Sequence, residues 1–259
     1  KGGFFIFTHN LIENLKKLVA YPLTTLFFIL FGLTLVVFHP IQWFCLRVFG
    51  YTQHKHSVTL LNWFIMRCTN VLGTRYRFKK DFPIPENVPL IIVSNHQSMY
   101  DIPPIIWYMR KHHPKFVSKI ELGKGIPSVS FNLRHGGSVL INRKDAKQSV
   151  EQLEKLGEYI EKYNRSAVIF PEGTRSRDGF PKKFYTTGLK VLMAHAPSAW
   201  IVPISINNSW KLLKYGKFPM GLASHLSLEV HRPFPNDGKP EGLIQQAESS
   251  IVQGINIPE

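Results

Sequence analysis

The chain has 259 residues, of which 44% are hydrophobic and 13% aromatic, so it can form a folded core and is neither disordered nor fibrous. Its 32 Lys and Arg residues outnumber its 17 Asp and Glu residues and give a formal net charge of +15. A surface of this sign attracts nucleic acid, an anionic membrane or an anionic substrate. Cys45 and Cys68, the only cysteines, form no zinc-site spacing and no disulfide framework, which is typical of a reducing compartment.

The first predicted element is an apolar helix. No Asp, Glu, Lys or Arg occurs between Lys17 and Arg47, and residues 18–38 are almost wholly hydrophobic. About 20 apolar residues suffice to span a membrane, and the His39-Pro40 pair is expected to break the helix. Three interpretations stay open: one transmembrane helix, a helical hairpin embedded in one leaflet, or a buried core helix of a soluble protein. Basic residues on both sides of the apolar stretch slightly favour the hairpin, because both of its ends lie on the same face of the membrane.

From about residue 84 the sequence predicts alternating strands and helices. Four β-branched runs are expected to form buried strands, at residues 91–94, 139–141, 167–170 and 201–205. Helices are expected over residues 145–164, 183–194 and 242–252. This alternation predicts an α/β fold with a mixed, mostly parallel sheet covered by helices. We place a boundary at the Pro-rich residues 81–85, which separates an N-terminal membrane-associated helical segment, 1–80, from an α/β domain, 81–259.

Polar residues follow the predicted strand that ends at Ser94, and open α/β sheets place their sites at such strand ends. His96 lies two residues beyond the strand, and Asp101 follows five residues later. On one continuous helix this spacing leaves the two side chains about 140° apart, so a turn must bring them together. A carboxylate at imidazole Nδ1 would let Nε2 act as a general base. By itself the pair is equally consistent with a surface histidine and a helix-capping aspartate.

A second polar block, Phe-Pro-Glu-Gly-Thr-Arg-Ser at residues 170–176, follows the third predicted strand. Gly173 permits close approach to the backbone, and the Arg175 guanidinium can bind phosphate in a bidentate manner. A solvated turn is the alternative interpretation.

Together, Asn95-His96-x-x-x-x-Asp101 and residues 170–176 resemble the first and third motifs of the glycerolipid acyltransferases. The similarity is closest to the branch that acylates 1-acylglycerol-3-phosphate, or lysophosphatidic acid. Residues 137–143 are similar to the second motif, with Asn142 where that motif often has Asp, and residues 201–204 are similar to the fourth. Residues 117–122 are similar to the lysine-bearing segment of the family, and all of these blocks occur in the family's order.

The resemblance implies that His96 is the general base and that Asp101 orients it. It also implies a substrate site formed by Lys119, Arg143, Glu172, Gly173, Thr174 and Arg175. Two arginines and one lysine suit a phosphomonoester better than a neutral head group. The oxyanion of the reaction needs hydrogen-bond donors, and backbone N–H groups after Asn95 or around Gly173 are the candidates.

The expected activity is transfer of a fatty-acyl group from an acyl thioester to the sn-2 hydroxyl of lysophosphatidic acid, which gives phosphatidic acid. No cofactor and no metal are expected, because acyl-CoA or acyl-carrier protein serves as co-substrate and the histidines lack partners at ligand spacing. Membrane lipids are expected partners, and the catalytic domain is expected on the cytoplasmic face of the cell membrane. Two alternatives are an acyltransferase for another lysolipid and a non-catalytic protein that binds anionic membranes. Nucleic acid is not expected, because the basic residues are scattered and no RNA-binding or helix-turn-helix motif occurs.

Overall fold

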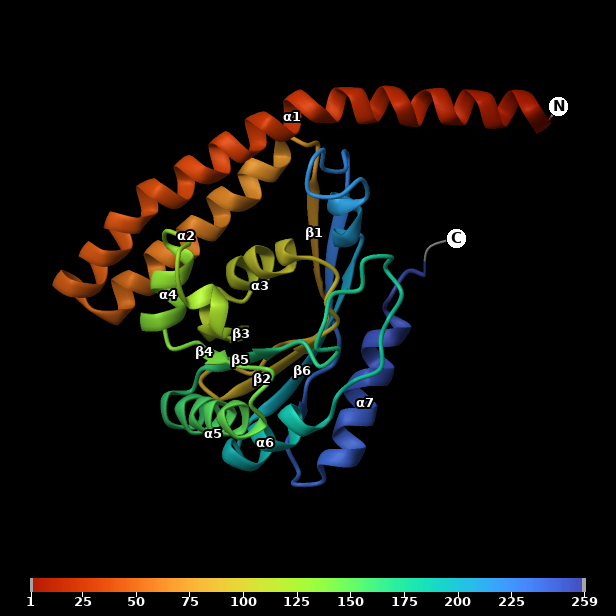
Figure 1. The fold of residues 1–259 in the computed structure, drawn as a ribbon. Coiled ribbons are helices and arrows are strands. Elements are labelled where there is room, and N and C mark those ends of the chain that lie inside the picture. The colour runs from red at the N-terminus through yellow and green to blue at the C-terminus, as the bar shows by residue number, and fades with distance from the viewer. Residues whose placement is uncertain (1, 258–259) are drawn as a thin grey trace.

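The fold begins with a long helix and a shorter one that lie side by side (Figure 1). In the computed structural model, which describes residues 2–257, α1 runs from Gly2 to Phe44 and continues into a π-helical turn, Cys45–Phe49. After Gly50, whose φ of 78° suits glycine, α2 runs from Tyr51 to Asn70. The predicted break at His39-Pro40 is therefore wrong. Proline removes one backbone hydrogen bond, and α1 continues through Pro40 despite this loss.

Many of the exposed large hydrophobic side chains of the described residues lie on α1. The segment Leu11–Phe49 is long and apolar enough to cross a membrane, and only 22% of its most apolar stretch is buried. Leu18, Leu33 and Val36 are each more than half exposed. A core helix of a soluble protein would be mostly buried, so this exposure favours association with a membrane.

Eight described strands form one sheet. They are β1 (Arg75–Lys80), β2 (Leu90–Ser94), β3 (Pro114–Lys119), β4 (Val139–Ile141), β5 (Ser166–Ile169), β6 (Trp200–Asn207), β7 (His225–Val230) and β8 (Phe234–Pro235). The strand order is β1-β7-β6-β2-β5-β3-β4, and β8 pairs with β6. Strands β6, β2, β5, β3 and β4 run parallel to one another, whereas β7 and β8 pair antiparallel with β6. The predicted mixed, mostly parallel sheet is confirmed.

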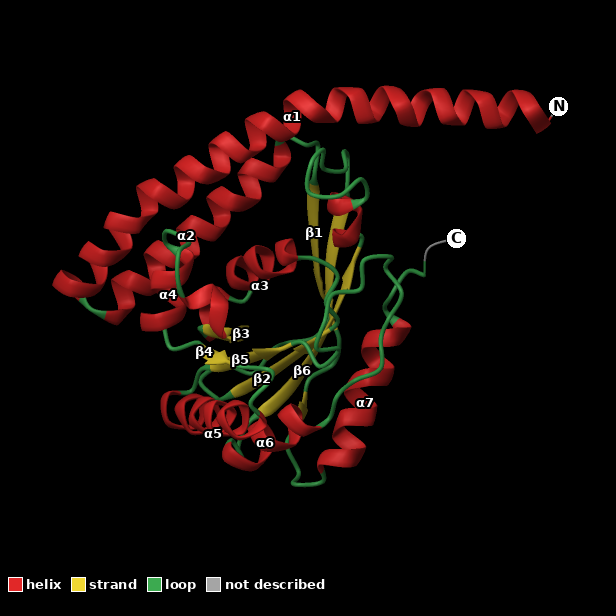
Figure 2. Cartoon of the chain, in the orientation of Figure 1, coloured by secondary structure: helices red, strands yellow, loops and turns green. Residues whose placement is uncertain are grey.

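Helices cover both faces of the sheet (Figures 1 and 2). The remaining helices are α3 (Ile102–Tyr108), α4 (Val129–His135), α5 (Ala146–Tyr163), α6 (Thr187–His195) and α7 (Pro240–Gln253). Adjacent residues of β2 point to opposite faces: Ile92 packs in a core with Phe27 of α1, while Ile91 packs in a second core with Leu156 of α5. The first core thus joins the N-terminal helices to the sheet.

The predicted helices are present, with one displaced start. Asp145 caps α5 as expected, because its side chain accepts a hydrogen bond from the Gln148 N–H at 2.9 Å. The helix predicted from residue 183 begins only at Thr187. The preceding residues form a loop held by a hydrogen bond from the Tyr185 N–H to the Pro171 carbonyl at 2.8 Å, a tertiary contact that overrides the local helical pattern.

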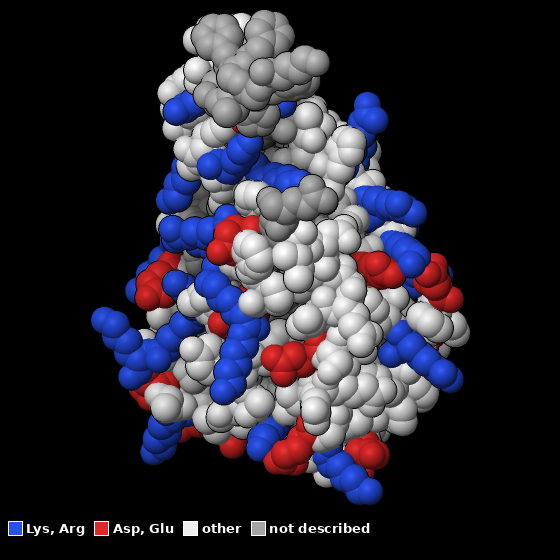
Figure 3. Space-filling model, turned by 90° about the vertical axis from the view of Figure 1, so that its right-hand side faces the viewer, with Lys and Arg blue, Asp and Glu red and all other residues white. Residues whose placement is uncertain are grey.

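On the face shown in Figure 3, lysine and arginine side chains are most numerous on the left, and uncharged residues cover most of the centre.

Candidate active site

The polar motifs converge on one edge of the sheet. Because β2, β3, β4, β5 and β6 are parallel, the loops after them emerge at the same edge, where open α/β sheets bind ligands. His96 follows β2, Glu172 follows β5, Lys119 ends β3 and Arg143 follows β4. Lys119 pairs with Ile141 in the sheet register, so Arg143 lies just beyond it.

His96 and Asp101 form a hydrogen-bonded pair at this edge. The imidazole Nδ1 lies 2.8 Å from Asp101 Oδ2, and a short 3₁₀ turn, Met99–Asp101, supplies the bend that a continuous helix could not. Oδ2 also accepts hydrogen bonds from the N–H groups of Gln97 at 2.7 Å and Ser98 at 2.9 Å. Asp101 therefore caps the turn and also binds the His96 ring.

The His96 ring also has an aromatic contact that helps to fix its orientation. It stacks on the Phe170 ring at a centroid distance of 4.1 Å and an interplanar angle of 15°. The His96 carbonyl accepts a hydrogen bond from the Ser176 N–H at 2.7 Å, which ties the loop after β2 to the loop after β5. With Nδ1 on Asp101, Nε2 is the nitrogen left for a substrate, and the His96 side chain keeps 16% of its surface exposed.

Glu172 is buried beside this pair without a hydrogen-bond partner. It lies in a turn closed by the Gly173 N–H and the Phe170 carbonyl at 3.1 Å, and Gly173 has a φ of 67°. Only 1% of Glu172 is exposed, and neither carboxylate oxygen has a partner among the described residues. Burial raises the pKa of Glu172 to about 7, and the nearby N–H groups of Lys182 and His96 offset part of this effect without reaching hydrogen-bond geometry.

Three cations of the predicted phosphate site have no acidic partner among the described residues: Lys119, Arg143 and Arg175. Lys119 and Arg143 are exposed, whereas Arg175 is half-buried. Because no carboxylate neutralises them, their charge is available to an anionic ligand.

Comparison with known proteins identifies the family. The family model for acyltransferases matches residues 75–207, which include every motif residue named above. The chain belongs to the acyltransferase family.

Individual relatives of this acyltransferase carry more specific names. It is 30% identical over 177 residues to a chloroplast 1-acyl-sn-glycerol-3-phosphate acyltransferase of Arabidopsis thaliana, a match that covers 66% of this chain and 46% of the relative. It is 28% identical over 236 residues to the 1-acyl-sn-glycerol-3-phosphate acyltransferase of Pseudomonas aeruginosa, with 89% of each chain covered. The chain spans about half the length of the first curated relatives that it matches, 46% to 52%.

A solved structure shares the fold of this acyltransferase. The crystal structure of the 1-acyl-sn-glycerophosphate acyltransferase from Thermotoga maritima matches with a TM-score of 0.75 at 23% identity. The match covers 92% of this chain and 95% of the other, so the N-terminal helices belong to the shared architecture.

Two residues of the site lie outside the predicted set. The Ser209 hydroxyl, after β6, donates a hydrogen bond to Asp101 Oδ1, and the Ser209 N–H donates to the Gln97 side chain at 3.1 Å. Lys182 donates to the Thr174 hydroxyl at 3.2 Å and to the Arg175 carbonyl at 2.9 Å. Sequence alone gives no signal for Ser209, because 108 residues separate it from Asp101. Lys182 resembles an ordinary solvated lysine in the sequence.

The motif residue Asn95 has a structural task. Its side-chain amide donates to the Ile206 carbonyl at 2.9 Å, and its carbonyl oxygen accepts from the Ile206 N–H at 2.7 Å. This double hydrogen bond fixes the loop after β2 against β6. Among the described residues, no group of three or more His, Cys, Asp or Glu side chains could hold a metal ion.

Proposed function

We propose that the chain transfers a fatty-acyl group from an acyl thioester to the sn-2 hydroxyl of 1-acylglycerol-3-phosphate and so forms phosphatidic acid. The observation that carries this proposal is the His96–Asp101 pair, with Nδ1 2.8 Å from the carboxylate and Nε2 left for a substrate hydroxyl. The names of relatives such as the Pseudomonas aeruginosa protein support the choice of acceptor.

The geometry of the pair supports the following reaction. Nδ1–H donates to Asp101, so Nε2 carries the lone pair that takes the proton of the acceptor hydroxyl. The oxygen attacks the thioester carbonyl and forms a tetrahedral intermediate, while Asp101 stabilises the imidazolium. Collapse of the intermediate breaks the carbon–sulfur bond, and His96 returns its proton to the departing thiolate. The acyl group therefore passes directly to the acceptor without a covalent enzyme intermediate.

Backbone donors for the oxyanion are assigned to the loop after β5. The N–H groups of Gln97 and Ser98, which follow Asn95, already bind Asp101. The Gly173 N–H binds the Phe170 carbonyl, whereas the N–H groups of Thr174 and Arg175 have no partner in the described part of the chain. These two groups are the better candidates for the role that an oxyanion hole requires.

The acceptor phosphate is assigned to Arg175, Lys119 and Arg143, whose cations lack acidic partners. Arg143 follows Asn142, where related motifs often have Asp, so we expect Arg143 to contribute less to phosphate binding than Arg175. The acyl donor is proposed to be acyl-CoA or acyl-carrier protein. The exposed apolar surface of α1 is proposed to hold the enzyme in the membrane, with the α/β domain on the cytoplasmic face.

The test is an acyl-transfer assay in detergent or vesicles with a panel of lysolipids and two acyl thioesters, a CoA ester and a carrier-protein ester. We expect the highest kcat/KM with 1-acylglycerol-3-phosphate, and an increase in KM for this acceptor when Arg175 is replaced by Gln. Lys155→Gln, an exposed charge change on α5, is the matched control and is expected to leave KM unchanged.

A preference for another lysolipid would keep the His96 chemistry and overturn the phosphomonoester acceptor. Absence of transfer to every acceptor would overturn the proposed activity.

A further inference from the structure

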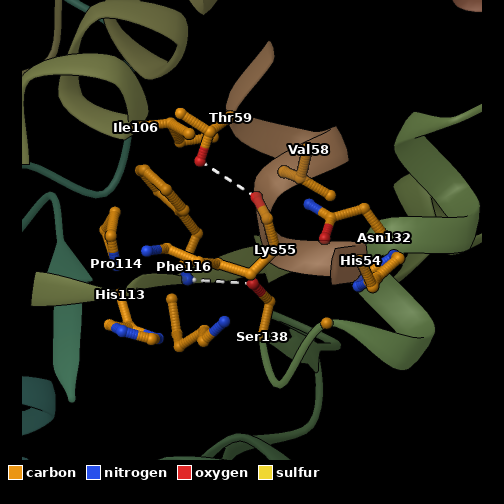
Figure 4. Close-up of a pocket in the computed structure, with 12 residues that line it drawn as sticks. His54, Lys55, Val58, Thr59, Ile106, His113, Pro114, Phe116, Asn132 and Ser138 are labelled. Atoms are coloured by element: carbon orange, nitrogen blue, oxygen red, sulfur yellow. Dashed lines mark hydrogen bonds between the residues drawn. The ribbon is translucent and has the colours of Figure 1, made fainter. Parts of the chain in front are cut away.

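A pocket lined by basic and apolar side chains lies at the opposite ends of the strands, where β3 begins. Side chains from the first turns of α2, including His54 and Lys55, line it together with His113 and Lys115 from the start of β3. Figure 4 shows Asn132 of α4 beside His54 in the same pocket. His96 lies beyond the far end of β2, a neighbour of β3 across β5, so this pocket is separate from the candidate active site.

Two polar side chains, His54 and Lys115, are buried in the pocket. His54 is 1% exposed, and its Nε2 atom has no partner among the described residues. Lys115 is 6% exposed, and its Nζ atom lies 4.7 Å from the centroid of the Tyr51 ring. The Arg165 guanidinium carbon also lies 3.7 Å from the centroid of that ring. One aromatic ring thus faces two cations, and buried charges are normally paired with an opposite charge.

The charged groups around the pocket are positive. Burial, together with the charges of Arg165 and Lys55, lowers the pKa of Lys115 to about 7. Burial also lowers the pKa of His54 to about 4, with Lys115 and His135 contributing. None of the ion pairs formed by the described residues includes Lys55, Lys115 or Arg165. The described chain therefore leaves this cluster of cations without an anion.

We propose that this pocket binds an oxyanion of the phosphate class. Lys115 and Lys55 supply positive charge, and His54 Nε2 and the Asn132 amide supply hydrogen-bond donors on the opposite wall. The pocket volume of about 30 Å³ accommodates a few oxygen-sized groups and excludes an acyl chain. The N-terminal end of α2 adds a favourable dipole for an anion.

The anion has two possible sources, a lipid headgroup and free phosphate. Phe49, 61% exposed at the end of the apolar segment, comes two residues before the start of α2. A membrane that holds α1 would bring anionic headgroups close to this end of α2. Binding of a headgroup would fix the α/β domain against the membrane surface, and binding of free phosphate would join α2 to the sheet.

The test uses the full chain in neutral detergent, with Lys115→Met as the principal variant. The matched control is Lys155→Met, the same exchange at an exposed position on α5. Thermal unfolding is followed with and without inorganic phosphate at constant ionic strength. Arg175→Gln, in a separate sample, removes phosphate binding at the candidate active site. Partition onto phosphatidylcholine vesicles with and without phosphatidylglycerol is measured for the same variants.

We expect phosphate to raise the melting temperature of the native chain and of Lys155→Met and Arg175→Gln by several degrees. Lys115→Met is expected to lose most of this shift. Without phosphate it should melt at or above the native temperature, because an unpaired buried charge has been removed. His54→Leu removes a hydrogen-bond donor and leaves Lys115 in place, so it should lose part of the phosphate-induced rise in melting temperature. This variant replaces Lys115→Met in the test if Lys115→Met does not fold.

If Lys115→Met loses the partition onto vesicles that depends on phosphatidylglycerol and Lys155→Met keeps it, the bound anion is a lipid headgroup. Loss of the phosphate shift alone identifies free phosphate. The proposal is overturned if Lys115→Met and Lys155→Met respond alike to phosphate and to phosphatidylglycerol. It is also overturned if Lys115→Met melts lower than the native chain while the phosphate shift persists, since Lys115 would then have only a structural role.

Discussion

The loops after β2 and β5 each contain one buried carboxylate. The two carboxylates differ in the number of hydrogen bonds that they accept. Asp101 is fully buried and accepts hydrogen bonds from His96, Gln97, Ser98 and Ser209. Glu172 is 1% exposed and has no hydrogen-bond partner among the described residues. A buried acid without partners costs folding free energy. We propose from this difference that Asp101 holds His96 in place, whereas Glu172 contacts a bound substrate.

The largest effect is expected from Asp101→Asn. The amide cannot accept all of these hydrogen bonds and favours the wrong histidine tautomer, so we expect kcat to fall by roughly 10³–10⁴-fold. The unfolding free energy should fall by about 1–3 kcal/mol, because a buried donor loses its partner. Steady-state kinetics and urea unfolding measure the two effects. An active Asp101→Asn enzyme would remove Asp101 from the mechanism.

Glu172→Gln is expected to have the opposite effect on stability. Activity should fall by roughly 10–100-fold if the carboxylate contacts the substrate in the transition state, corresponding to about 1.4–2.7 kcal/mol. The unfolding free energy should stay equal or rise, because no hydrogen bond is lost in the free enzyme. A large loss of stability in Glu172→Gln would show that Glu172 has a structural role like that of Asp101.

The pH dependence of stability separates the two carboxylates further. The pKa of Glu172 is raised from 4.5 to about 7 in the folded chain, chiefly by burial, so the folded state holds its proton more tightly than the unfolded state. Between pH 4.5 and about 7 the native chain should therefore lose stability as pH rises, by roughly 2–3 kcal/mol from this group. Denaturant unfolding of native and Glu172→Gln proteins should diverge over this window. Parallel curves would contradict the raised pKa.

The smallest effect is expected from Ser209→Ala, which removes one donor from Asp101. Ser209 is a positioning residue, so we expect kcat to fall by about 3–10-fold with KM little changed, and stability to fall by about 1 kcal/mol. Ser209→Thr keeps the hydroxyl and should restore most of kcat. Ser198→Ala, which also removes a serine hydroxyl that binds a carboxylate, at Glu161 on the surface, is the control. Equal kinetics for the two alanine variants would exclude the positioning role.

The comparison also shows what the sequence could predict. Strand ends and ordered motifs are local features, so the edge of the sheet and the residues His96, Asp101 and Glu172 could be placed together from sequence. The bonding of the two carboxylates could not, because Ser209 reaches Asp101 across 108 residues. Long-range contact also explains the late start of α6, where Tyr185 binds Pro171.

The basic pocket at the start of β3 could not be predicted from the sequence either. Its residues come from α2, α4 and β3, and each of these cations resembles an ordinary surface charge in its own segment. Only the packing of α2 against the sheet brings them together. The net charge of +15 indicated an anionic partner, but could not locate where that partner would bind.

The most direct test of the account is the initial rate of acyl transfer to 1-acylglycerol-3-phosphate by His96→Gln, measured beside its melting temperature. Gln can keep a hydrogen bond to Asp101 but cannot act as a base at Nε2, so we predict a native-like melting temperature and a rate lower by roughly 10³–10⁴-fold. A folded His96→Gln enzyme that transfers acyl groups at the native rate would contradict the central role of His96.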